Sequence, residues 1–158
     1  MNQKIGFNRE KLRKLVRSKN DLHASYLAIA GDIDFIRRQQ LPHLEQMIKN
    51  ADEHTELAKN REAFAARNEN REPKTIKSFT EYSPDEMLAA YPSHPIRHHL
   101  SLSNLQKYVG WRQELESLVQ HQHEISAKMT PLVNLVARCK EFLQQHGITD
   151  ADVGIDLG

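Results

Sequence analysis

The sequence predicts an all-α protein, an elongated antiparallel helical hairpin of the coiled-coil type. Two long stretches carry apolar residues at helical spacing, and a proline-rich segment separates them. The composition agrees, because 27% of the residues are charged and only 6% are aromatic, a balance typical of long, surface-rich helices. We expect one domain over residues 1–158, since a chain of 158 residues fits one domain better than two.

The clearest helix is predicted over residues 101–146. Steps of three and four alternately from Tyr108 to Leu143 meet eleven positions, of which ten are apolar. Ser101 or Ser103 caps its start, and Gly147 is a natural stop. The predicted core or interface anchors on this stripe are Tyr108, Trp111, Leu115, Leu118 and Ile125.

The first helix is predicted over about residues 8–68. The phase of its apolar stripe slips by about one residue near Gln40. Gly31 weakens a helix by roughly 1 kcal/mol relative to alanine, so we expect a hinge risk there. A kink is expected before Pro42. The stripe consists of Leu12, Leu15, Leu22, Tyr26, Ile29, Ile33, Ile36, Leu41, Leu44, Ile48, Ala51, Thr55 and Ala58.

Residues 69–100 form the predicted connector, which holds four prolines. Within it, "SPDEMLAAY" predicts one short helix over about residues 84–91, with Ser83 as its cap and Pro84 at its first position. The rest of the connector is expected to be extended.

The predicted register pairs residues whose numbers sum to about 170, as in an antiparallel hairpin. Pro42 and Pro131 would then lie side by side, and roughly the first fifteen residues of helix one would project past their partner. Removing residues 1–20 is therefore expected to leave the fold intact. A hairpin of two helices leaves part of so wide an apolar stripe uncovered, which predicts a homodimeric four-helix bundle or a different protein partner.

The N-terminal segment is the one strongly charged feature. Residues 1–19 hold seven basic residues against Glu10, a net charge of +6, whereas the whole chain carries +1. Arg9, Arg13 and Arg17 recur every four residues and form one ridge, which can seat phosphates, an anionic membrane surface or an acidic partner, although a solvated helix face is the more usual interpretation. The predicted partner-binding or phosphate-binding residues are Arg9, Lys11, Leu12, Arg13, Lys14, Leu15, Val16, Arg17 and Lys19.

An acidic tail over residues 147–158 follows the second helix. It carries Asp150, Asp152 and Asp156 and leaves that helix at the end where the basic ridge begins. The tail is expected either to fold back and neutralise the ridge or to compete with an outside anion for it.

The histidines do not form a metal-binding motif in the sequence. "HEISA" at 123–127 has Ala127 where the zinc-protease pattern needs a second histidine. The best remaining pair is His54 with His121, a weak metal candidate, and the histidines of "YPSHPIRHHL" are expected to be solvated linker residues. Cys139, the only cysteine, lies on the apolar stripe, which indicates a core residue and a reducing compartment.

These features favour a non-enzymatic, cytoplasmic interaction protein, an adaptor or inhibitor that docks a helical surface on a larger protein. The alternative is an accessory subunit associated with nucleic acid through its basic N-terminal helix, and a metal-binding helical protein comes third. We expect no catalytic residues, no cofactor and no membrane span, since the longest apolar runs are too short for a bilayer.

Overall fold

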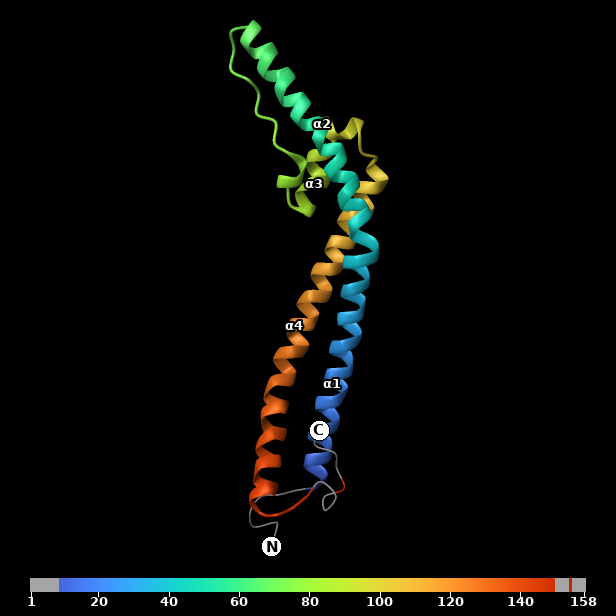
Figure 1. Cartoon of the computed structure of the whole chain (residues 1–158), viewed down its shortest axis with the longest axis vertical. Coiled ribbons are helices and arrows are strands. Elements are labelled where there is room, and N and C mark those ends of the chain that lie inside the picture. Colours follow the sequence, from blue (N-terminus) through green and yellow to red (C-terminus); the bar gives the residue numbers. More distant parts are fainter. Residues whose placement is uncertain (1–8, 150–153, 155–158) are drawn as a thin grey trace. The chain divides into compact units, whose positions relative to one another are not determined.

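The computed structural model describes residues 9–149 and 154, and all regular structure within these ranges is helical (Figure 1). The helix from Arg9 to Asn68 packs against the helix over residues 102–145, which confirms the predicted all-α helical hairpin. The elements are α1 (Arg9–Phe35), a π-helical turn (Ile36–Gln40), α2 (Leu41–Asn68), α3 (Pro84–Ala90), α4 (Leu102–Gln145) and short 3-10 turns at Phe79–Glu81, Tyr91–Ser93 and Pro95–His98.

The π-helical turn lies where the apolar stripe of the first helix changes phase. The backbone N–H of Leu41 donates to the carbonyl of Ile36, five residues earlier, so the turn holds one more residue than an α-helical turn. Pro42 follows directly and offers no N–H to continue the α-helical ladder. The extra residue keeps Ile36, Leu41 and Leu44 all buried, and the predicted irregularity before Pro42 therefore takes the form of a wider turn.

The helix does not break at Gly31, where the sequence indicates a hinge risk, because α1 runs through this residue. A Cβ atom added at Gly31 would meet nothing within 4 Å, so no close packing requires the glycine. The helical hydrogen bonds of the residues on either side are sufficient to keep Gly31 in the helix despite its low helix propensity.

The predicted helix ends are confirmed on α3 and α4. Ser83 and Glu86 form a reciprocal capping box at the start of α3. The Ser101 hydroxyl accepts from the backbone N–H of Asn104 at 3.2 Å at the start of α4. After α4, Gly147 adopts a φ of 67°, and the N–H of Ile148 reaches back to the carbonyl of Leu143, which is the usual glycine-terminated helix end.

The chain divides into two compact units. Unit 1 comprises residues 1–31 and 119–158, and unit 2 comprises residues 32–118. In unit 1, α1 lies beside α4, and Leu12 and Val16 from α1 form a buried core with Val136 and Leu143 from α4. Cys139 is half-buried against this core, in agreement with its predicted role as a core residue.

Unit 2 has the larger core, because the connector folds back along α2 and adds to it (Figure 1). Three of its residues, Phe79, Ile96 and Leu105, have no exposed surface. The connector is therefore packed against α2, and it is less extended than predicted, because it holds three 3-10 turns besides the predicted short helix. The core consists of Ile48, Ala51, Phe79, Met87, Ile96, Leu100, Leu105 and Val109.

The predicted register is wrong in both units. The cores bring Leu12 together with Leu143 in unit 1, and Ile48 together with Leu105 in unit 2. In each pairing, the residue of α4 lies about fifteen positions earlier in the sequence than the partner that the predicted register assigns. This shift corresponds to roughly four helical turns. The reason lies in the connector, which pairs with the distal half of α2 and leaves α4 to begin opposite the middle of α2. Pro42 belongs to unit 2 and Pro131 to unit 1.

In the part of the chain that the structure describes, no helix combines the length and the apolar character needed to cross a membrane.

Candidate functional site

The basic side chains of the N-terminal segment lie on the outer side of α1 in unit 1. Because Arg9, Arg13 and Arg17 are four residues apart and all exposed, they form the single ridge that the sequence predicts. The exposed basic residues of this segment, which we call the basic ridge, are Arg9, Lys11, Arg13, Lys14 and Arg17.

The apolar residues of the same segment are not available to a partner, contrary to the prediction. Leu12 is 3% exposed and Val16 is 6% exposed, because both pack on α4. Leu15 packs against the same core and is half-buried, as is Lys19. The start of α1 is thus covered by its own chain and offers charge to the surroundings, with little apolar surface.

A cavity of about 660 Å³ opens beside the basic ridge. Its basic lining residues are Arg13, Lys14 and Arg17, and two acidic residues, Glu10 and Asp21, line it as well. This mixture of charges suits a polypeptide segment with acidic and polar side chains better than a run of phosphates, which would face the two carboxylates. The remaining lining residues are Val16, Asn20 and Gly154.

Gly154, a described residue of the predicted tail, lies beside the basic ridge. A Cβ atom added there would lie 3.5 Å from an Nη atom of Arg9 and 4.0 Å from one of Arg13. Gly154 has a φ of 67°, a backbone conformation that favours glycine. The acidic residues of the predicted tail lie outside the described residues; they are Asp150, Asp152 and Asp156.

The histidines named as weak metal candidates have other neighbours. His54 in α2 stacks on His99, with ring centroids 3.6 Å apart and planes 7° apart. Ring nitrogens point their lone pairs in the ring plane, so two parallel stacked rings do not converge on one ion. His121 belongs to unit 1, where its Nδ1 lies 3.6 Å from a carboxylate oxygen of Glu124. Across residues 9–149 and 154, no three metal-ligating side chains gather at one point.

His94 is the histidine that the sequence analysis placed wrongly. It is 5% exposed rather than solvated, and its ring edge meets Phe79 with centroids 5.0 Å apart. Its Nδ1 accepts the backbone N–H of Ile96 at 3.1 Å and caps the following 3-10 turn. Nε2 therefore carries the proton and donates to the Lys77 carbonyl at 2.6 Å. His94 thus ties the part of the connector at Lys77 and Phe79 to the 3-10 turn Pro95–His98, which precedes α4.

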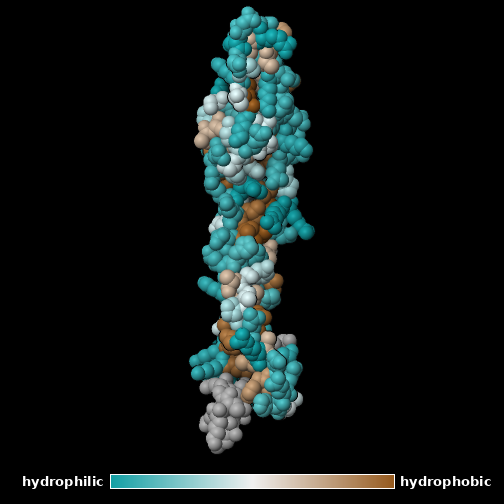
Figure 2. Space-filling model, turned by 90° about the vertical axis from the view of Figure 1, so that its left-hand side faces the viewer, coloured by the Kyte–Doolittle hydropathy of each residue, from teal (hydrophilic) through white to brown (hydrophobic). Residues whose placement is uncertain are grey.

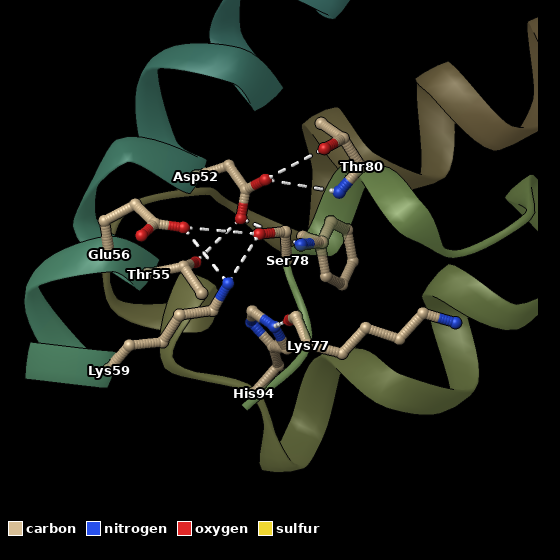
Figure 3. A network of polar contacts seen from close by, with 9 residues as sticks. Asp52, Thr55, Glu56, Lys59, Lys77, Ser78, Thr80 and His94 are labelled. Carbon is tan, nitrogen blue, oxygen red and sulfur yellow. Dashed lines mark hydrogen bonds and ion pairs between the residues drawn. The ribbon is translucent and has the colours of Figure 1, made fainter. Parts of the chain in front are cut away.

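A network of polar contacts, which we call the polar clasp, holds the connector to α2 (Figure 3). The Asp52 carboxylate accepts from the backbone N–H groups of Phe79 at 2.8 Å and Thr80 at 3.2 Å. It also accepts from the hydroxyls of Thr55 at 2.7 Å and Thr80 at 3.1 Å. Partial burial alone would raise the pKa of Asp52, but the hydrogen bonds from Phe79, Thr55 and Thr80 outweigh it and lower the pKa below its usual value.

Lys59 and Ser78 complete the clasp. The distance between Lys59 Nζ and Ser78 Oγ is that of a catalytic serine–lysine pair, but the protonation that the contacts favour is not. Lys59 Nζ donates to Ser78 Oγ at 2.9 Å and to Glu56 at 3.1 Å. A lysine that activates a serine must be neutral in order to take the hydroxyl proton. An ammonium paired with a carboxylate has no lone pair for this purpose, so the geometry favours a structural tie.

The basic residues near the end of α2 also serve the fold. Arg71 pairs with Glu62 and Glu69, and Glu62 accepts the backbone N–H of Lys74 at 3.1 Å. The hydrogen bond from Arg71 is the main cause that lowers the pKa of Glu62. Arg71 is therefore engaged in shaping the turn that follows α2.

The predicted anchors on α4 differ in burial. Leu115 and Ile125 are buried, whereas Tyr108, Trp111 and Leu118 are half-buried. Desolvation raises the pKa of the Tyr108 hydroxyl. All five take part in packing or border it, and their role at an interface stays a prediction.

Apolar surface remains exposed, and on the face drawn in Figure 2 it is dispersed. Figure 2 shows brown apolar side chains in separate patches between teal hydrophilic ones. The most exposed of the large apolar residues is Phe64, at 65%. The exposed large apolar residues of the described chain are Leu27, Phe35, Leu57, Phe64, Leu88, Leu102, Val133 and Leu135.

Comparison of the chain with protein-family models, with curated proteins and with solved structures finds no match. Function therefore has to be argued from the surface itself. The basic ridge with its adjoining cavity is the surface feature that combines concentrated charge with a hollow of ligand size.

Proposed function

We propose that this protein is a non-enzymatic docking protein whose basic ridge on α1 receives an acidic segment of a larger protein partner. The observation that carries the proposal is the cavity of about 660 Å³ beside the ridge, lined by Arg13, Lys14 and Arg17. Since Leu12 and Val16 are turned into the core, recognition rests on charge and hydrogen bonds rather than on an apolar helix face.

Two features favour an acidic polypeptide over nucleic acid, which is the alternative ligand. Glu10 and Asp21 line the same cavity as the three basic residues and would repel a continuous row of phosphates. The chain as a whole carries a net charge of only +1, whereas dedicated nucleic-acid proteins are usually much more basic. A peptide that alternates acidic and neutral side chains meets neither objection.

The test measures fluorescence anisotropy with a labelled peptide rich in Asp and Glu and, separately, with a labelled DNA duplex. We expect the wild-type protein to bind the peptide with an affinity that falls as salt rises. The double change Arg13→Glu and Arg17→Glu should weaken binding by at least about tenfold, since it reverses two charges at the cavity.

The matched control reverses two exposed cations of unit 2, Arg37→Glu and Lys49→Glu, which changes the net charge by the same amount. This control should bind like the wild type. Absence of peptide binding, or equal losses in the two double variants, would overturn the proposal. Binding of the duplex but not of the peptide would put the nucleic-acid alternative in its place.

We also propose that the protein forms a homodimer. The supporting observation is that Leu27, Val133 and Leu135 stay exposed in unit 1, where the buried core residues that the structure describes come from α1 and α4. Light scattering should give twice the mass of the chain, and Leu27→Glu with Val133→Glu should return the mass to that of a monomer. A wild-type monomer at tens of micromolar would contradict this expectation.

A further inference from the structure

The residues that follow α4 are attached to the core of unit 1. Gly147 ends the helix with a φ of 67°, and the backbone N–H of Ile148 donates to the carbonyl of Leu143 at 2.8 Å. The Ile148 side chain is half-buried and packs against the core that contains Leu12 of α1 and Leu143 of α4. The chain therefore leaves α4 in contact with the core that α4 shares with α1.

A described residue further along the tail lies at the basic ridge. Gly154 lines the same cavity as Arg13, Lys14 and Arg17. A Cβ atom added to Gly154 would lie 3.5 Å from an Nη atom of Arg9. Since its φ of 67° favours glycine, this residue allows the backbone to lie close to the guanidinium groups in a conformation that a side chain would disfavour.

The sequence of the tail has the chemistry that the proposed function assigns to the partner segment. Residues 147–158 hold three aspartates and no basic residue, and neutral residues separate the aspartates from one another. Such a segment complements the basic residues of the cavity without placing a continuous row of negative charge against Glu10 and Asp21. The three aspartates lie outside the described residues.

From these observations we propose that the tail is an internal ligand of the basic ridge, which the acidic segment of a partner has to displace. The inference rests on the proposed function, because the tail and the partner compete for one surface. The ridge is thus autoinhibited, and a change that releases the tail raises the affinity for the partner.

The short tether determines the size of the effect. Ile148 is fixed on the core and Gly154 lies at the ridge, so the effective concentration of the tail at the ridge is on the order of 1 mM. If the untethered tail binds with a Kd of about 0.1 mM, it weakens the binding of an outside peptide by about tenfold.

The first test measures fluorescence anisotropy of the labelled peptide rich in Asp and Glu with variants of the full chain. Neutralising the tail should tighten peptide binding by about tenfold; this triple variant carries Asp150→Asn, Asp152→Asn and Asp156→Asn. Gly154→Ala changes no charge, but the positive φ disfavours alanine, so this variant should tighten binding by at least about threefold.

The matched control neutralises three exposed carboxylates of unit 2 and changes the net charge by the same amount as the triple tail variant. It carries Glu53→Gln, Glu114→Gln and Glu116→Gln and should bind the peptide like the wild type. Equal affinities of the wild type, the triple tail variant and Gly154→Ala would overturn the internal ligand and leave the proposed function in place. Absence of peptide binding in every variant would refute the proposed function and this inference with it.

The second test needs no peptide and follows the backbone N–H of Gly154 by 15N relaxation in the full chain. We expect an order parameter above about 0.6 in the wild type and below about 0.6 in the double variant Arg9→Gln and Arg13→Gln, which removes the two nearest guanidinium groups. Gly147, at the end of α4, should keep its order parameter in both proteins and serves as the internal control. An order parameter of Gly154 that is the same in both proteins would overturn the contact between tail and ridge.

Discussion

Replacing Asp52 with alanine tests whether the polar clasp holds the connector on α2. The carboxylate accepts four hydrogen bonds, and two of them come from donors on residues with no exposed surface, the Thr55 hydroxyl and the Phe79 N–H. A buried donor left without an acceptor costs about 1–3 kcal/mol, whereas the two donors of the exposed Thr80 turn to water. Asp52→Ala should therefore lower the free energy of unfolding of unit 2 by about 2–4 kcal/mol.

Urea denaturation followed by tryptophan fluorescence is the appropriate assay. Trp111 is the only tryptophan of the chain and lies in unit 2, so its emission reports on the unit that contains Asp52. Asp52→Asn keeps one acceptor oxygen, so it should lower the free energy of unfolding by roughly half as much as Asp52→Ala.

The control removes another aspartate of the same unit. Asp34 makes an exposed ion pair with Arg38 in the next helical turn, at 2.8 Å, and Asp34→Ala should change stability by less than about 0.5 kcal/mol. A loss in Asp52→Ala no larger than in Asp34→Ala would refute the reasoning. The difference between wild type and Asp52→Ala should also become smaller in acid, since the lowered pKa of Asp52 makes the stabilisation by its charged form complete above pH 3.8 and removes that part as the pH falls through the folded-state pKa.

Three further predictions use the same measurement of unfolding free energy or its thermal equivalent. Phe79→Ala should cost about 3–5 kcal/mol because its side chain has no exposed surface, whereas Phe64→Ala, at 65% exposure, should cost less than about 1 kcal/mol. Equal losses would contradict the packing described for the connector. Gly31→Ala should stabilise the protein by about 0.5–1 kcal/mol, and Gly147→Ala should destabilise it by at least about 1 kcal/mol, since Gly147 has a positive φ and Gly31 does not. Leu12→Ala should lower the free energy of unfolding by about 2–5 kcal/mol, because this side chain is buried. A loss below about 1 kcal/mol would indicate that Leu12 is exposed, as the sequence predicted.

The elements were predictable from the sequence because their signals are local. A one-residue slip of the apolar stripe near Gln40 corresponds to the π-helical turn Ile36–Gln40, and Ser83 with Glu86 three residues later forms the capping box. Helix ends, proline positions and periodicity involve residues within one or two turns of each other, so they can be found without knowing the fold.

The register was not predictable in the same way. Helical periodicity determines which face of a helix is buried, but it does not say which level of the partner helix that face meets. The level is decided by the path of the connector, which returns along α2 through the contacts of Asp52 with Phe79 and of Lys59 with Ser78. The residues of these two pairs are separated by 27 and 19 positions in the sequence, so no local sequence pattern predicts the contacts.

The buried state of His94 was missed for a related reason. Its neighbours in sequence are polar or proline, which is typical of a solvated linker, and its burial comes from Phe79 and from the carbonyl of Lys77. One signal was present, because histidine before a proline that opens a helical turn is in a position to cap that turn, as His94 does for Ile96.

The corrected register changes how the basic ridge must be tested. If the start of α1 projected freely, deleting residues 1–20 would remove a partner and leave the fold intact. Leu12 and Val16 instead cover Val136 and Leu143, so the truncation should expose these residues and lower the free energy of unfolding by at least about 2–5 kcal/mol, the usual loss for one buried leucine. Loss of binding in a truncated protein would then report damage to unit 1 as readily as loss of the ridge. Charge reversal at Arg13 and Arg17 leaves the core residues in place, and a truncated protein that keeps the wild-type melting temperature would contradict this reasoning.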